Sequence, residues 1–152
     1  PVAIDLRFIV VVLKVNNDLE RIGDLAENLT ARAVYLAERE PMPEPMAIIN
    51  GMFVTIRSML KDSLDSLVKL DVDLARKVIE QDDGVDQINR QMYDDFRQMM
   101  ARDASMIEQA TSWLSCSRYL ERIADLATNI SEDVVFMVEG EVVRHQTQET
   151  SL

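Results

Sequence analysis

The fold is decided by residues 12–36, which read VLKVNNDLERIGDLAENLTARAVYL. Apolar residues recur along this stretch in alternating steps of three and four, the spacing that places side chains on one face of an α-helix. The positions of this apolar seam are Val12, Val15, Leu19, Ile22, Ala26, Leu29, Ala33 and Leu36. The seam predicts a long bundle helix from about Ala3 to Glu38, which Pro41, Pro43 and Pro45 bring to an end.

Three further helices are expected downstream. Pro45 suits the first turn of a second helix that ends near Leu70, and Asp71 is a suitable N-cap for a third. Ser105 and Glu108 have the spacing of a capping box, so a fourth helix is expected from Ser105 to about Glu139, with Gly140 as its stop. The expected apolar lines are Ile49, Phe53, Ile56, Leu60 and Leu67 in the second helix, and Leu74, Val78, Val85, Ile88, Met92 and Met99 in the third.

Composition supports the same fold class. Aromatic residues make up 5% of the chain, glycine and proline occur four times each, and nine methionines add to the helix-forming apolar residues. We therefore expect an all-α, antiparallel bundle of four long helices, built on a core that a chain of 152 residues can bury. Residues 141–152 are polar and without periodicity, and they are expected to form a flexible tail.

The charge and the cysteine content exclude several classes of protein. A net charge of -11 repels the phosphate backbone of nucleic acid and favours cations or a basic protein surface as partners. A single cysteine, Cys116, excludes an intrachain disulfide and is compatible with a reducing compartment. The longest apolar run, residues 8–13, is far too short to cross a bilayer, so no membrane insertion is expected.

One polar motif occurs twice. Residues 19–28 read LERIGDLAEN and residues 120–129 read LERIADLATN. Core packing explains the shared apolar positions, but it does not require the matching glutamate, arginine, aspartate and asparagine on the other face. The repeat also extends the seam to the fourth helix, at Trp113, Cys116, Leu120, Ile123, Ala127, Ile130, Val134 and Met137.

The repeated carboxylates are candidate metal ligands. Glu20 and Asp24, and likewise Glu121 and Asp125, lie one helical turn apart, where like charges repel by a few tenths of a kcal/mol. A bound cation would reverse this effect, and carboxylate rows on neighbouring helices are common in the metal sites of helix bundles. A third row, Asp82 and Asp86, would face the fourth helix if the two helices pack antiparallel. A merely solvated acidic face is the alternative, which the duplication disfavours.

No set of residues indicates an enzyme. The chain contains no glycine-rich phosphate loop, no Ser-His-Asp set and no cysteine and histidine spacing for zinc. Its only histidine, His145, lies in the expected tail, which disfavours a catalytic di-metal bundle with Glu-x-x-His ligands. Cys116 lies on the seam and is expected in the core. A metal-free bundle that acts only through protein contacts remains an alternative.

Four stretches resemble the PhoU family of accessory regulators of bacterial phosphate uptake. They are Asn17–Asp24, Asp82–Asp86, Leu120–Asp125 and Asn129–Asp133. The family is built from two three-helix repeats, so the resemblance implies that residues 1–40 are the last helix of a first repeat and residues 45–140 a complete second repeat. The first helix would then lack its repeat partners. We expect its apolar seam to dock on the other three helices, or to be exchanged between chains in a homodimer.

The resemblance also implies a metal centre and a role. It assigns Glu20, Asp24, Glu121 and Asp125 to the family's metal motif, with Asp82 and Asp86 as the partner motif. The bound metal would be iron, with zinc, nickel, manganese or magnesium as alternatives. Leu25 and Leu126 stand where many members carry histidine, so no ligand is expected there. The implied role is a non-catalytic, cytoplasmic adaptor between the ATPase of a phosphate ABC transporter and a membrane sensor histidine kinase, which restrains phosphate-starvation signalling.

Overall fold

A computed structural model describes residues 2–140, with side chains from Asp5 onward. The four long helices are α1 (Val2–Ala37), α2 (Pro43–Lys69), α3 (Val72–Arg102) and α4 (Ile107–Glu139), and a single 3-10 turn, η1 (Ala104–Met106), precedes α4. The expected all-α antiparallel bundle is therefore confirmed. The flexible tail expected at residues 141–152, which includes His145, lies outside the described residues.

Most of the helix ends follow from the sequence. The Asp71 side chain accepts a hydrogen bond from the Leu74 backbone N–H at 3.0 Å, so it is the N-cap of α3. Gly140 ends α4 in the left-handed conformation, with a φ of 75°, which glycine adopts without a steric penalty. Leu70, the C-cap of α2, adopts the same conformation with a φ of 55°.

The capping box expected at Ser105 and Glu108 is wrong. Instead, the Asp103 carboxylate accepts hydrogen bonds from the Ser105 backbone N–H at 2.9 Å and from its hydroxyl at 2.6 Å. These bonds close the 3-10 turn η1, and α4 begins two residues later than expected, at Ile107. Asp103 offers a charged acceptor directly before the turn, and it therefore takes the position of the cap from Ser105.

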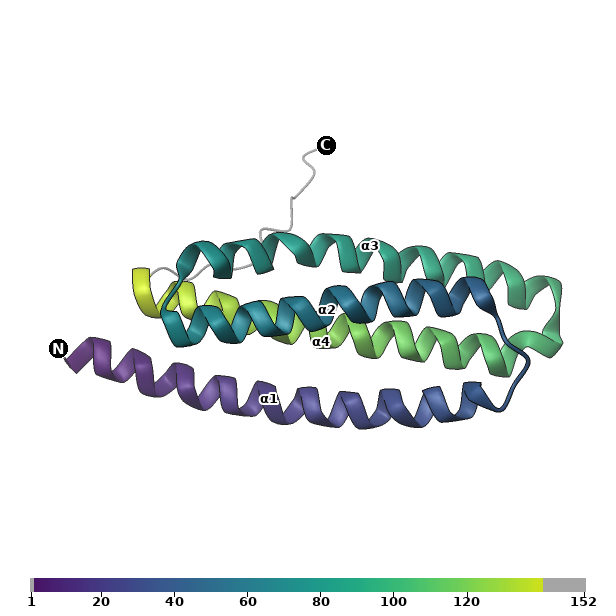
Figure 1. Ribbon diagram of the computed structural model, residues 1–152, viewed down its shortest axis with the longest axis horizontal. Coiled ribbons are helices and arrows are strands. Elements are labelled where there is room, and N and C mark those ends of the chain that lie inside the picture. The colour runs from purple at the N-terminus through teal and green to yellow at the C-terminus, as the bar shows by residue number, and fades with distance from the viewer. Residues whose placement is uncertain (1, 141–152) are drawn as a thin grey trace.

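Helix α4 is the centre of the bundle (Figure 1). Helices α1, α2 and α3 all pack against it, and more than half of its 33 residues are buried. Every position of the apolar seam expected in α4 is buried, from Trp113 to Met137. Cys116 lies in this core as expected, and burial raises the pKa of its thiol to about 11. That thiol is therefore a packing group rather than a nucleophile at neutral pH.

Helix α1 lies beside α4 alone, and its expected seam is only half correct. Val15, Ile22, Leu29 and Leu36 face the bundle, whereas Val12, Leu19, Ala26 and Ala33 are exposed. The helix buries a line shifted by about one residue, which consists of Val11, Val15, Asp18, Ile22, Leu25, Leu29 and Leu36. Both lines follow the same three-and-four spacing, so periodicity could not choose between them. The direction of the single neighbour, α4, decides which line is covered.

The expected seams of α2 and α3 each contain an error of the same kind. Phe53 and Ile88 are exposed rather than buried. The buried residues that the expected lines leave out include Met52 and Met59 in α2, and Ala75, Asp82 and Phe96 in α3. Met52 and Met59 precede the expected positions Phe53 and Leu60 by one residue each, so the covered face of α2 is also rotated toward α4.

An ion pair fixes α1 on α4. The Lys14 ammonium of α1 donates to the Asp133 carboxylate of α4, which is buried. Asp18 lies next to this pair and is also buried. Burial raises the pKa of Asp18, Arg21 lowers it, Asp133 raises it further and Lys14 lowers it. The pair of Lys14 and Asp133 therefore links α1 to α4 beside the apolar line, whereas Asp18 and Arg21 belong to the same helix.

The two copies of the motif offer a matched test of this packing. Leu120 is 1% exposed in the centre of the bundle, whereas its counterpart Leu19 is 40% exposed on α1. Leu120→Ala should lower the free energy of unfolding by about 2–5 kcal/mol because it leaves a cavity. Leu19→Ala should lower it by less than about 1 kcal/mol. Urea denaturation measures both, and equal losses would contradict the central position of α4.

Candidate metal centre

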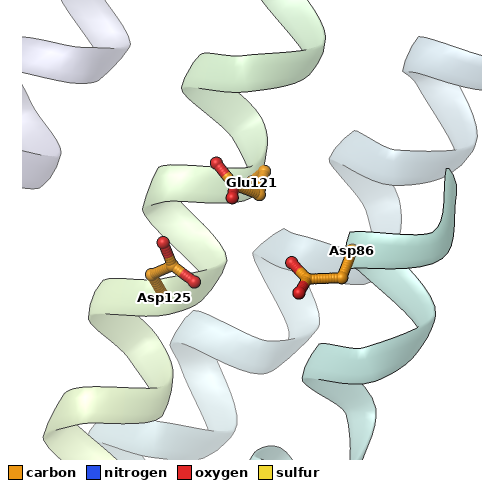
Figure 2. Close-up of side chains that lie close together, drawn as sticks. All are labelled: Asp86, Glu121 and Asp125. Atoms are coloured by element: carbon orange, nitrogen blue, oxygen red, sulfur yellow. The ribbon is translucent and has the colours of Figure 1, made fainter. Parts of the chain in front are cut away.

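Three carboxylates meet between α3 and α4. Asp86 projects from α3, and Glu121 and Asp125 project from α4 one helical turn apart (Figure 2). One oxygen of each carboxylate lies within 4.8 Å of the others. All three side chains are half-buried. We call Asp86, Glu121 and Asp125 the carboxylate cluster.

The spacing of the cluster fits a metal ion. Oxygen ligands stand about 2.0–2.6 Å from magnesium or calcium, so two oxygens on opposite sides of one ion are about 4–5 Å apart. The three oxygens of the cluster lie within that span. Carboxylate oxygens suit hard ions such as magnesium and manganese, and they also bind iron in helix bundles.

The electrostatics of the cluster favour a cation as well. Burial raises the pKa of Glu121, and the neighbouring carboxylates of Asp125 and Asp86 raise it further. Arg122 and Arg118 act in the opposite direction. Glu121 therefore holds its negative charge at a cost in free energy, which a bound cation would remove.

Asp82, the fourth residue expected at this centre, lies elsewhere. It is 3% exposed and occupies an inward position of α3, between Val78 and Val85. The side chain thus points into the bundle one turn before Asp86, and Asp82 does not belong to the carboxylate cluster. The two aspartates expected to act together are therefore separated. Asp82 lies in the core, and Asp86 lies in the carboxylate cluster.

The first copy of the motif forms no comparable cluster within residues 5–140. Glu20 and Asp24 are both exposed on α1. Asp24 borders a hollow of about 450 Å³ between α1 and α4, together with Arg21, Arg122 and Asp125. The Asn28 side chain, which belongs to the same row, donates to the Asp24 backbone carbonyl at 2.9 Å. The structure thus brings together three of the six candidate ligands and leaves Glu20, Asp24 and Asp82 apart.

The two leucines at the family's histidine position pack apolar surface. Leu126 is buried in the core and Leu25 packs against it from α1.

The sequence prediction overlooked the arginines beside the cluster. Arg21 lies 3.8 Å from Asp18. Arg122, in contrast, forms no salt bridge with any described residue, and it borders a groove with Arg90 and Arg118. Arg118 and Arg122 lie one turn apart on the helix face that carries Glu121, and this spacing could have signalled a basic surface.

Comparison with known proteins identifies the family. The sequence profile of the PhoU domain matches residues 1–33 and 49–134, which is most of the chain. The chain belongs to the PhoU family. The structure of PhoU from Pseudomonas aeruginosa superposes with a TM-score of 0.88 at 33% identity, covering 93% of this chain and 68% of that one. The phosphate transport system regulatory protein PhoU from Streptococcus pneumoniae gives a TM-score of 0.78 at 27% identity, covering 93% and 66%.

Relatives in the PhoU family are longer than this chain. A phosphate-specific transport system accessory protein PhoU homolog from Aquifex aeolicus is 41% identical over 146 residues, which are 96% of this chain and 66% of the relative. A homolog of the same name from Clostridium acetobutylicum is 36% identical, over 93% of this chain and 64% of the relative. The chain thus spans slightly less than two thirds of these PhoU relatives. Within residues 2–140, no helix is long and apolar enough to cross a bilayer.

The raised pKa of Glu121 leads to a testable effect on stability. Because folding raises this pKa above its ordinary value of 4.5, the ionised side chain weakens the metal-free fold at neutral pH. Glu121→Gln should therefore raise the melting temperature of the metal-free protein at about pH 7. The gain should be lost as the pH falls below 4.5, where glutamate is protonated in both states.

Thermal melts in the presence of a chelator measure this effect. Glu20, the exposed counterpart of Glu121 in the first copy of the motif, provides the control. Glu20→Gln should leave the melting temperature unchanged both at about pH 7 and below pH 4.5. A lower melting temperature for metal-free Glu121→Gln at neutral pH would show that the ionised form stabilises the fold.

Proposed function

We propose that this chain is the metal-carrying part of a phosphate-transport accessory protein, in which a cation is bound by Asp86, Glu121 and Asp125. The observation that carries the proposal is the carboxylate cluster, whose oxygens lie within 4.8 Å of one another on two different helices. The names of the relatives in Aquifex aeolicus and Clostridium acetobutylicum support the accessory role. Iron is the proposed metal by family resemblance, with zinc, nickel, manganese or magnesium as alternatives.

The cation would act as a bridge rather than as a catalyst. Asp86 belongs to α3, and the other two ligands belong to α4. A bound ion would replace the repulsion between these carboxylates with an attraction that ties the two helices together. The occupancy of the site would therefore set how firmly α3 is held against α4. That is a suitable property for a non-catalytic regulator.

We further propose the partners that the family resemblance implies. The protein would act in the cytoplasm, at the membrane only through its partners, as an adaptor between the ATPase of a phosphate ABC transporter and a sensor histidine kinase. The net charge of -11 would favour basic surfaces on both partners. The protein would restrain phosphate-starvation signalling without catalysing a reaction itself.

Elemental analysis of the purified protein tests the metal site. The double substitution Glu121→Ala with Asp125→Ala should abolish the bound metal, because it removes two of three ligands. The metal should also raise the free energy of unfolding of the unsubstituted protein, by about 2.7 kcal/mol when the free metal concentration is a hundred times Kd. The duplicated motif supplies a matched control, since Glu20→Ala with Asp24→Ala should leave the metal content unchanged. An unchanged metal content in the first variant would refute the assignment and favour a metal-free bundle.

The outer face of α1 leads to a proposal about assembly. Leu6, Ile9, Val10 and Leu13 are all exposed there. So large an apolar patch is unusual on a monomer, and we propose that a second copy of the chain covers it. Analytical ultracentrifugation should find a homodimer that Ile9→Glu with Leu13→Glu dissociates, whereas Val54→Glu on α2, which is also exposed, should leave it intact. A monomeric unsubstituted chain would contradict the proposal.

A further inference from the structure

A groove runs along α3 and α4 directly beside the carboxylate cluster. It has a volume of about 790 Å³, and both Glu121 and Asp125 line one part of it. Beyond them the lining includes Arg90 and Tyr93 of α3 and Arg118 and Arg122 of α4. We call this feature the arginine groove.

Two arginines of the groove, Arg118 and Arg122, lie near Glu121 and lower its pKa, but they form no ion pair at contact distance with a described residue. None of Arg90, Arg118 and Arg122 forms a salt bridge with a residue in the described part of the chain. The side chains of all three are exposed at the groove. In a chain with 27 acidic residues and 16 basic ones, three such arginines on one groove indicate a surface suited to an anion.

Asn89 adds a positioned hydrogen-bond donor to the groove. The hydroxyl of Ser117, which is completely buried, donates to the Asn89 side-chain oxygen at 2.7 Å. This bond fixes the amide and leaves its NH2 group as the part of Asn89 that can serve a ligand. This NH2 group itself has no hydrogen-bond partner among residues 5–140.

The charge of the groove depends on the metal. Without a cation, the carboxylates of Asp94 and of the cluster outnumber the three arginines by one, so an anion is repelled on balance. A divalent cation makes the balance positive. Asp86 and Arg90 lie one turn apart on α3, about 6 Å along the helix axis, which is a distance that one tetrahedral oxyanion can bridge.

We propose that the arginine groove binds a phosphate group, with one oxygen on the cation of the carboxylate cluster and others on Arg90, Arg118 and Asn89. This inference rests on the metal centre proposed above. Arginine binds phosphate oxygens in pairs, and hard cations prefer them as ligands. The phosphate is either the free inorganic ion or the end group of a small monoester, because both present the same oxygens. Metal and phosphate then bind cooperatively, since each improves the electrostatic environment of the other.

Calorimetric titration of the full chain with inorganic phosphate tests the proposal, first without metal and then loaded with Mn²⁺. Phosphate should bind at least about tenfold more tightly to the loaded chain. Arg90→Gln with Arg118→Gln should weaken this binding by at least about tenfold, while the Mn²⁺ content stays the same. The control Arg97→Gln removes an exposed arginine of α3 outside the groove and should change neither quantity. A parallel titration with glycerol phosphate distinguishes the two sources by which ligand binds more tightly.

The outcomes separate this inference from the metal centre. If the chain takes up Mn²⁺ but phosphate does not bind, or binds equally well to the double arginine variant, the arginine groove is not the site and the metal centre stands. If the chain takes up no Mn²⁺, the metal-dependent phosphate site is refuted, and the metal centre is decided by elemental analysis of the purified protein. A spectral change of the bound Mn²⁺ on addition of phosphate, absent in the double variant, would support direct contact between the two ligands.

Discussion

The structure depends on the enclosure of α4 by three other helices. A helix that is covered on so many sides needs small side chains where its neighbours approach most closely. Ala124 and Ala127 are completely buried in α4. Among the buried hydroxyls of α4, that of Ser112 donates to the Glu108 backbone carbonyl one turn earlier, and that of Ser117 donates to Asn89 of α3. Only narrow strips of α4 remain accessible. Four of its charged groups lie there, with Arg118, Glu121, Arg122 and Asp125 lining the groove beside α3.

The same constraint explains why two nearly identical motifs have different surroundings. Around Glu121, α3 supplies a facing carboxylate and the three side chains become half-buried. Around Glu20, the only neighbouring helix is α4, and it meets a different face of α1. The chemistry of a carboxylate pair therefore depends less on its own sequence than on the helix opposite. Identical residues form a candidate centre in one copy and an exposed row in the other.

Much of the fold could be predicted from the sequence because the information is local. Periodicity gave the helices, and capping chemistry gave the ends at Asp71 and Gly140. The covered face of α1, by contrast, depends on where α4 lies, and two apolar lines one residue apart satisfy the same spacing. Asp82 shows the same limit within the site. Its position four residues before Asp86 suggested a shared role. The rotation of α3 instead places Asp82 in the core and Asp86 in the carboxylate cluster.

The position of α1 beside α4 alone has a consequence for synthesis on the ribosome. Helix α1 leaves the ribosome before α4 and can dock only after α4 has been made, because within residues 2–140 it packs against α4. At roughly 5–20 residues per second, this delay lasts several seconds. Contacts so far apart in the sequence also favour slow closure of the bundle, so the docking of α1 onto α4 should be a late step in its folding.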